Sequence, residues 1–145
     1  MKVVVQRVKN ASVSINSELF STINQGLLVL FGVEKDDKNE SMLWLVKKLL
    51  NLRIFSDECG KMNKSIIDIQ GEIMVVSQFT LAGDCKKGTR PSFDNAELPD
   101  KAMQMYQKFV AELKKSGLSV KTGEFGAMMD VKLCNDGPVT FILEK

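Results

Sequence analysis

Histidine is absent from this chain of 145 residues, and its absence excludes several classes of active site. Without an imidazole there is no Ser-His-Asp or Cys-His pair, no HExxH zinc site and no histidine base that titrates near neutral pH. Most hydrolase mechanisms are therefore excluded, and any catalysis must use other groups.

Cysteine is scarce as well, and its spacing fits neither a disulfide framework nor a zinc knuckle. The three cysteines, Cys59, Cys85 and Cys134, are odd in number and form no CxxC pair. We interpret them as free thiols, and we expect no metal site.

Long apolar runs are also missing, since none approaches the roughly 18 residues that a membrane span requires. The first residues, MKVVVQRVKNASVSI, alternate like a strand and do not read as a signal peptide. The sequence therefore predicts a cytoplasmic protein. Its formal net charge of +2 is too small to indicate a polyanionic partner, so any nucleic-acid binding must rest on local clusters.

Apolar residues predict several strands in the first half of the chain. Residues 3–7 and 11–15 alternate on either side of Lys9-Asn10, which predicts two short strands joined by a turn. The run GLLVLFGV, residues 26–33, is apolar throughout and predicts a strand that is covered on both faces. A short strand is expected at 52–55 and a longer one at 72–81.

Two helices and three further strands are predicted in the rest of the chain. Apolar residues recur at helical spacing after Asn39, a candidate N-cap, and again between Pro99 and Gly117. The last two strands are expected to be joined by a turn at Asn135-Asp136-Gly137-Pro138. The three strands are expected at residues 118–123, 127–135 and 138–144.

This order of elements predicts a single α/β domain over residues 1–145. We expect three layers, β/β/α, with mostly antiparallel sheets and two main helices. Two helices cannot cover both faces of so much sheet. Either two sheets pack on each other or a second subunit covers an apolar face, and we favour a homodimer.

The segment SQFTL, residues 77–81, places polar groups where a buried strand is expected to continue. Alternation would put Gln78 and Thr80 together on one face, from which both could reach a ligand. Ordinary hydrogen bonding at a strand end explains them equally well. Thr80 and Ser77 have no evident base, because Lys86 could serve only if it were strongly desolvated. A side-chain nucleophile is therefore not expected.

Lys86, Lys87 and Arg90 lie within five positions of one another in a loop that contains Gly88. Such a loop could contact phosphates and so position a partner without reading its sequence. A solvated loop explains the same charges equally well. The glycine and lysine spacing is not that of a Walker motif.

The segment NDGPVT, residues 135–140, fits a plain turn, but it could also accept hydrogen bonds from a ligand. Pro138 lacks an N–H, so the neighbouring backbone offers successive carbonyl oxygens without a donor to pair with them. If the Gly137–Pro138 bond is cis, both carbonyls can point the same way and bind an ammonium group.

The segment GEFGAMMDV offers further candidates. Phe125, Met128 and Met129 could line a pocket, although such residues near a strand are more often plain core. Asp130 could act as an acid or base, but it has no partner carboxylate at a useful spacing and is as easily a solvent-facing residue.

The residues of three segments closely resemble the D-aminoacyl-tRNA deacylases, also called D-tyrosyl-tRNA deacylases. These are SQFTL at 77–81, AGDCKKGTRPSFDNA at 82–96 and NDGPVT at 135–140. The likeness runs nearly end to end, through RVKNASV at 7–13, NLRIFSDECGKMNKSI at 51–66 and VKTGEFGAMMDV at 120–131.

The resemblance implies a homodimer that hydrolyses the ester between a D-amino acid and the 3′-terminal adenosine of tRNA, without a metal or cofactor. Glycine should not be strictly rejected. The family's sites lie at the subunit interface, where SQFTL of one subunit meets the cis Gly-Pro pair of the other. Ser77, Gln78, Phe79 and Thr80 would form the adenosine and oxyanion side of the site.

By the same resemblance, Gly137 and Pro138 would form a chiral gate that Arg7 helps to hold, and Phe125 and Met129 would line the adenine pocket. Backbone N–H groups would stabilise the oxyanion. The ribose 2′-hydroxyl would activate or orient water, although an older proposal makes Thr80 the nucleophile. Two alternatives stay open, which are a nucleic-acid-binding module without catalysis and an esterase that uses Thr80 or Ser77.

Overall fold

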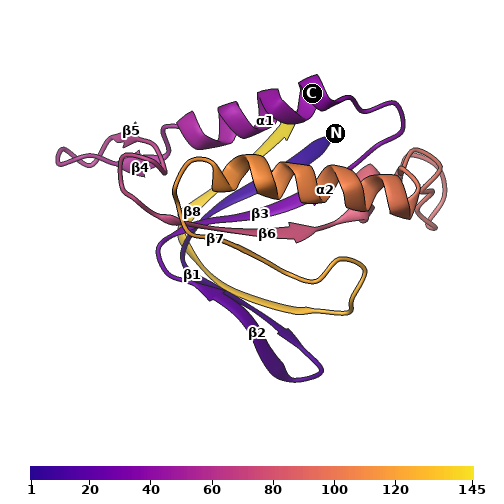
Figure 1. Cartoon of the computed structure of the whole chain (residues 1–145), viewed down its shortest axis with the longest axis horizontal. Coiled ribbons are helices and arrows are strands. Elements are labelled where there is room, and N and C mark those ends of the chain that lie inside the picture. The colour runs from indigo at the N-terminus through magenta and orange to yellow at the C-terminus, as the bar shows by residue number, and fades with distance from the viewer.

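Six strands form one curled sheet, and two helices lie on one of its faces (Figure 1). The computed structural model describes residues 1–145. The strand order is β2-β1-β3-β6-β7, and β8 pairs with β1 outside this path. The strands are β1 (Lys2–Ile15), β2 (Glu18–Ile23), β3 (Gly26–Gly32), β6 (Glu72–Ser77), β7 (Val120–Thr122) and β8 (Asp130–Glu144).

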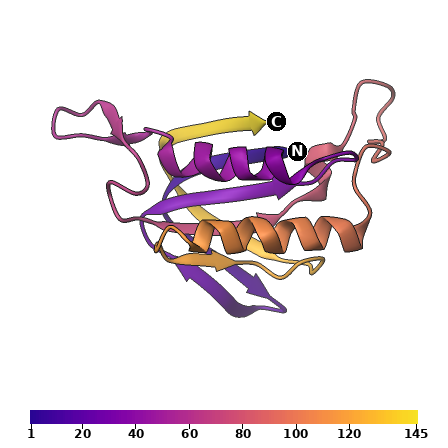
Figure 2. The same cartoon turned by 45° about the horizontal axis from the view of Figure 1, so that its top comes forward.

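Most strand pairs in this sheet are antiparallel, as predicted, but β6 lies parallel to both β3 and β7. A separate two-stranded hairpin joins β4 (Phe55–Ser56) to β5 (Met62–Lys64), so the strand predicted at 52–55 is shorter and lies later in the chain. The helices are α1 (Asn39–Asn51) and α2 (Pro99–Lys114), and Figure 2 shows them side by side over the sheet.

The hairpin predicted within residues 3–15 is wrong, because β1 is one continuous strand. Its first half pairs with β3 and its second half pairs with β2. The exposed pair Lys9-Asn10 marks the place where β1 changes its partner, not a change of direction. The first hairpin turn lies instead at Asn16-Ser17, where both residues have the positive φ that a tight hairpin turn needs.

The two faces of the sheet pack into two separate apolar cores. The helices cover one face, where Val5, Val29 and Val75 lie against residues of both helices. Leu28 and Met74 point to the other face, where they meet Ala11 and Val13 from the far half of β1. The curled end of the sheet therefore covers part of the face that the helices leave free.

The helices agree with their apolar periodicity. In α1 the buried residues are Met42, Leu45, Val46 and Leu49, and Lys38 rather than Asn39 is the N-cap. Pro99 is the first residue of α2, where its missing N–H costs nothing. Neither helix is long and apolar enough to cross a membrane. The buried residues of α2 are Ala102, Tyr106, Phe109, Val110 and Leu113.

The turn predicted at Asn135-Asp136-Gly137-Pro138 is also wrong. Both halves of β8 pair with β1 in the same direction, and residues 136–139 form a bulge opposite Arg7. Pro138 lacks the N–H that a ladder needs and Gly137 has φ of +131°, so the regular pairing breaks here. The strand then resumes on the same partner, which makes the segment a bulge and not a connection.

Candidate functional site

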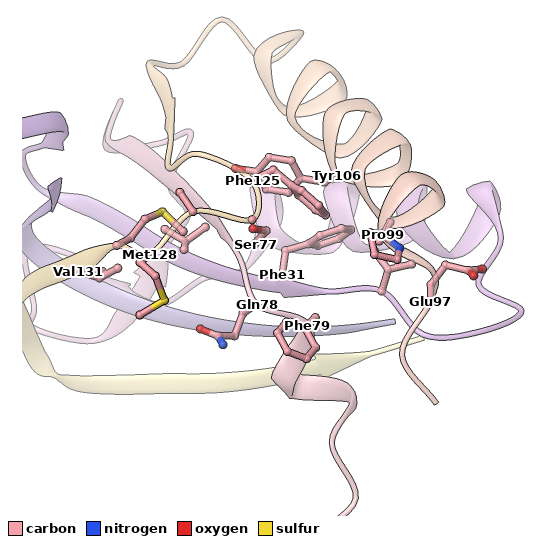
Figure 3. A pocket seen from close by; sticks show the side chains of 16 residues that line it. Phe31, Ser77, Gln78, Phe79, Glu97, Pro99, Tyr106, Phe125, Met128 and Val131 are labelled. Atoms are coloured by element: carbon pink, nitrogen blue, oxygen red, sulfur yellow. The ribbon is translucent and has the colours of Figure 1, made fainter. Parts of the chain in front are cut away.

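A cavity of about 520 Å³ opens between the end of β6, the start of α2 and the segment 125–131 (Figure 3). Its lining is mostly apolar and includes five predicted site residues: Ser77, Gln78, Phe79, Phe125 and Met129. Thr80 does not line the cavity. The other lining residues are Phe31, Val33, Val76, Glu97, Pro99, Ala102, Tyr106, Gly126, Ala127, Met128 and Val131.

The polar end of the cavity is a turn and not a continued strand. β6 ends at Ser77, and Phe79–Ala82 form a short 3-10 helix, η1, so the predicted alternation through residue 81 is wrong. The N–H of Gln78 donates to the carbonyl oxygen of Phe31 at 2.8 Å. A Cβ on Gly32 would lie 2.8 Å from the carbonyl oxygen of Gln78, so glycine lets the turn pack against β3.

This turn presents two backbone N–H groups that have no acceptor within it. The N–H groups of Leu81 and Gly83 donate to the carbonyl oxygens of Gln78 and Thr80, which closes the turn. Phe79 and Thr80 are the first two residues of η1, so their N–H groups precede the first bond of the helix. They are therefore free to donate to a ligand.

The side chains around the turn include no activated nucleophile. The Nε2 of Gln78 donates to the Oγ1 of Thr80 at 2.5 Å, so the nearest partner of this hydroxyl is an amide and not a base. Glu97 lines the cavity, but its carboxylate accepts the N–H of Leu98 at 2.8 Å and points away from Ser77 in Figure 3.

Aromatic packing fixes the apolar wall of the cavity. The ring of Tyr106 lies 5.8 Å from that of Phe125 and 6.2 Å from that of Phe31, measured between centroids. Its hydroxyl donates to the carbonyl oxygen of Val75 at 2.8 Å, and the N–H of Gly123 donates to the same oxygen at 3.1 Å. Tyr106 thereby joins α2 to the segment that carries Phe125. The sequence gives no sign of this role, because the spacing of Tyr106 on α2 is that of any buried residue.

Burial raises the pKa of Tyr106 from its ordinary value of 10.0 to about 12. The folded state binds the phenolic proton more tightly, so this stabilisation is complete below pH 10 and is lost as pH rises toward 12. The full loss, reached above pH 12, should be about 3 kcal/mol of unfolding free energy. Tyr106 is the only tyrosine, so absorbance at 295 nm reports it alone. We expect a midpoint near 12 in the folded protein and near 10 in denaturant, and equal midpoints would contradict the assigned burial.

The predicted gate residues lie together in the bulge, away from the cavity of their own chain. The Gly137–Pro138 peptide is cis, and Pro138 is exposed. Arg7 is only 8% exposed, and its Nε donates to the carbonyl oxygen of Asp136 at 3.0 Å and lies 3.2 Å from the carboxylate. Its other hydrogen bond goes to the carbonyl oxygen of Ile54. None of these residues lines the cavity.

Asp136 is the partner of Arg7, a contact that was not predicted from the sequence. The two residues are far apart in the chain, so the pairing cannot be read from spacing. One indication in the sequence is that a buried arginine requires an acidic partner, and Asp136 is the acidic residue beside the glycine.

The three predicted phosphate-contacting residues lie on an exposed loop that starts directly after η1. Lys86, Lys87 and Arg90 are all exposed, and none of them forms an ion pair. The backbones of Asp84 and Ser92 exchange hydrogen bonds of 2.8 and 2.9 Å across the base of the loop. The loop is therefore anchored at its base, and its cations face solvent.

The chain's cysteine and acidic side chains form no group of three or more that could hold a metal ion. Cys59, Cys85 and Cys134 are exposed free thiols, as predicted.

Comparisons with known proteins identify a family for this chain. Residues 4–144 match the family described as D-Tyr-tRNA(Tyr) deacylase. A D-aminoacyl-tRNA deacylase of Thermosipho africanus is 54% identical over 144 residues, which cover 99% of this chain and 97% of the relative. A protein of the same name from Bacillus cytotoxicus is 52% identical over 144 residues, 99% of each chain.

Two solved structures share the fold. One, described as c-Myc DNA Unwinding Element Binding Protein, superimposes with a TM-score of 0.95 at 45% identity, over 100% of this chain and 99% of the other. Another, described as a probable eukaryotic D-amino acid tRNA deacylase, gives a TM-score of 0.85 at 18% identity, over 98% and 97%. At that identity the second likeness supports the fold alone. The match over nearly the whole length establishes that this chain belongs to the D-Tyr-tRNA(Tyr) deacylase family.

Proposed function

We propose that this chain hydrolyses the ester between a D-amino acid and the 3′-terminal adenosine of tRNA, and so recycles mischarged tRNA. Family membership supports the reaction, and the observation that supports its chemistry is the turn at Phe79 and Thr80. Two successive backbone donors without acceptors begin at Phe79, which lines an apolar cavity, in a chain without histidine. The substrate is tRNA, so the reaction belongs to the cytoplasm.

The main-chain donors supply the electrostatic part of the catalysis. Water attacks the ester carbonyl, and the N–H groups of Phe79 and Thr80 stabilise the charge that develops on the carbonyl oxygen. A well-aimed donor of this kind is worth about 3–4 kcal/mol of transition-state stabilisation. The bond to the ribose oxygen then breaks, and that oxygen leaves as a hydroxyl after it receives the proton lost by the water. The products are the free D-amino acid and uncharged tRNA.

The ribose 2′-hydroxyl orients or activates the water in this proposal. The support is the lack of a base near Thr80, whose hydroxyl contacts the amide of Gln78. Ser77, Gln78 and Thr80 then position the adenosine and the ester. Phe125 and Met129 hold the adenine against the apolar wall of the cavity.

Each site is completed by a second copy of the chain. Pro138 is exposed on a bulge that does not line the cavity of its own subunit, so a gate at this position would act on a partner's cavity. Ile142, which is 67% exposed on the same strand, leaves an apolar surface for such a homodimer to cover.

Chirality is read by exclusion at the gate. The carbonyl oxygens of Gly137 and Pro138 bind the α-ammonium group and occupy the space that an L side chain would need. D-amino acids of many kinds should therefore pass, and glycine should not be strictly rejected.

Matched D-tyrosyl-tRNA and L-tyrosyl-tRNA test the function directly. We expect loss of the D ester alone, measured as released tyrosine. Thr80→Ala should keep substantial activity and no acyl-enzyme should be trapped, because Thr80 only positions the substrate. Complete loss of activity, or a covalent adduct on Thr80 in the unmodified protein, would instead support the hydroxyl-nucleophile esterase.

A second candidate is a nucleic-acid-binding module without catalysis. It is favoured by the exposed basic loop and by the 45% identity with the solved structure described as c-Myc DNA Unwinding Element Binding Protein. Binding of both aminoacylated tRNAs without turnover of either would support it.

A further inference from the structure

We propose that Phe79, Phe93 and the basic loop form a stacking surface for the single-stranded nucleotide that precedes the terminal adenosine. This surface, defined by Phe79, Phe93, Lys86, Lys87 and Arg90, rests on the proposed function, because it binds the RNA part of the same substrate. It lies outside the cavity and reads shape and charge, not the base sequence.

The two aromatic rings are placed as one exposed pair at the mouth of the cavity. Their centroids are 5.0 Å apart and their planes meet at 60°. Phe79 is 58% exposed and Phe93 is 39% exposed, although rings of this size are usually buried. Phe79 also lines the cavity, so a nucleotide on this pair would adjoin an adenosine inside it.

Backbone contacts on both sides of the loop hold Phe93 in this position. A Cβ on Gly83 would lie 3.1 Å from the ring of Phe93, so glycine allows the ring to pack against the chain. The N–H of Lys35 donates to the carbonyl oxygen of Asn95 at 2.9 Å, and Glu34 forms an isolated antiparallel β-bridge with Ala96. The segment that carries Phe93 is therefore joined to the segment that follows β3.

The charge of the loop favours a nucleic acid as the occupant. Between the paired residues Asp84 and Ser92, the cations Lys86, Lys87 and Arg90 have no acidic neighbour in sequence and no ion pair. Asp84 and Asp94 lie at the base, where the Asp84 carboxylate accepts the N–H of Lys86 at 2.8 Å. Exposed aromatic faces beside unpaired cations match the stacking bases and phosphates of a single strand.

Truncated substrates test this surface apart from the chemistry. Wild type should hydrolyse the D-tyrosyl ester of the trinucleotide CCA with a kcat/KM about 5- to 150-fold above that of the D-tyrosyl ester of adenosine, the gain expected for one stacked base. Phe93→Leu should remove this gain and leave the adenosine ester unchanged. Phe93→Tyr should keep it, because its ring still stacks. Phe20→Leu, at an exposed phenylalanine of β2, is the matched control and should change neither ester.

Binding of unacylated CCA gives a readout that does not need turnover. Phe93→Leu should weaken it, and raised salt should weaken wild-type binding, while Phe20→Leu should match wild type. Failure of the wild type to hydrolyse either D ester would refute the proposed function and leave this binding result to decide the surface. The surface is refuted if Phe93→Leu keeps the CCA gain and binds CCA normally. It is equally refuted if that variant changes the mass of the assembly, since Phe93 would then serve contact between copies of the chain.

Discussion

Phe79→Pro should lower kcat about 100- to 1,000-fold below that of Phe79→Ala, the loss expected when one oxyanion donor is removed. Both substitutions remove the phenyl ring, but only proline removes the backbone N–H. The difference between the two variants therefore isolates the main-chain donor. The measurement is single-turnover hydrolysis of D-tyrosyl-tRNA, which separates the chemical step from product release.

The fold of Phe79→Pro should survive, because proline is compatible with the first position of a helical turn. Gln78 has φ of −144° and ψ of 78°, so the preceding residue is already outside the helical region that proline disfavours. Circular dichroism and thermal melting check this point. Equal kcat in the two variants would show that the N–H of Phe79 takes no part in the chemistry.

Gly137→Ala should slow hydrolysis of the D ester about 100-fold and lower the ratio of D to L hydrolysis with it, since a displacement of about 1 Å at a site can cost that much. The backbone here has φ of +131°, which side chains rarely adopt. The new Cβ would lie 2.8 Å from Cγ2 of Val139 and 3.2 Å from the guanidinium of Arg7. The bulge must therefore move, and its carbonyl oxygens move with it. Initial rates on matched D- and L-tyrosyl-tRNA give the ratio.

Gly117→Ala is the matched control for this substitution. Gly117 also has a positive φ, +81°, but a Cβ there would meet nothing within 4 Å, and it lies beyond the end of α2. Strain of this kind costs about 1–3 kcal/mol of stability, and we expect it in both variants. Only Gly137→Ala should change selectivity. An unchanged ratio in Gly137→Ala would remove the gate from the mechanism.

The helices and the buried strands of the fold were predictable because they depend on local periodicity. The apolar face of α2 and the buried run at β3 are both found in the structure. The errors at Lys9-Asn10 and at residues 135–138 have a different origin. Polar residues, glycine and proline indicate a local break, but a strand that changes its partner or bulges is decided by residues far away in the chain. The strand at β2 was missed because its exposed side chains do not alternate.

The candidate site was predictable only through its motifs. Periodicity alone placed Gln78 and Thr80 on a strand, whereas the structure turns the chain there and presents N–H groups instead. The residue types of Phe125 and Met129 favour a place in the core, yet both line the same cavity as Ser77. The contact between Arg7 and Asp136 joins distant strands, and no spacing rule indicates it.

The central claim is that main-chain atoms from two subunits build each site, and mixed dimers test it most directly. In a homodimer of Phe79→Pro or of Gly137→Ala, both sites are damaged. A mixed dimer of the two would unite an intact turn with an intact gate in one of its sites. Subunit exchange at equal concentrations should therefore restore about a quarter of wild-type activity, because about half of the dimers are mixed and each has one intact site. Activity that stays at the mean of the two separate variants would show that each site is built within one chain.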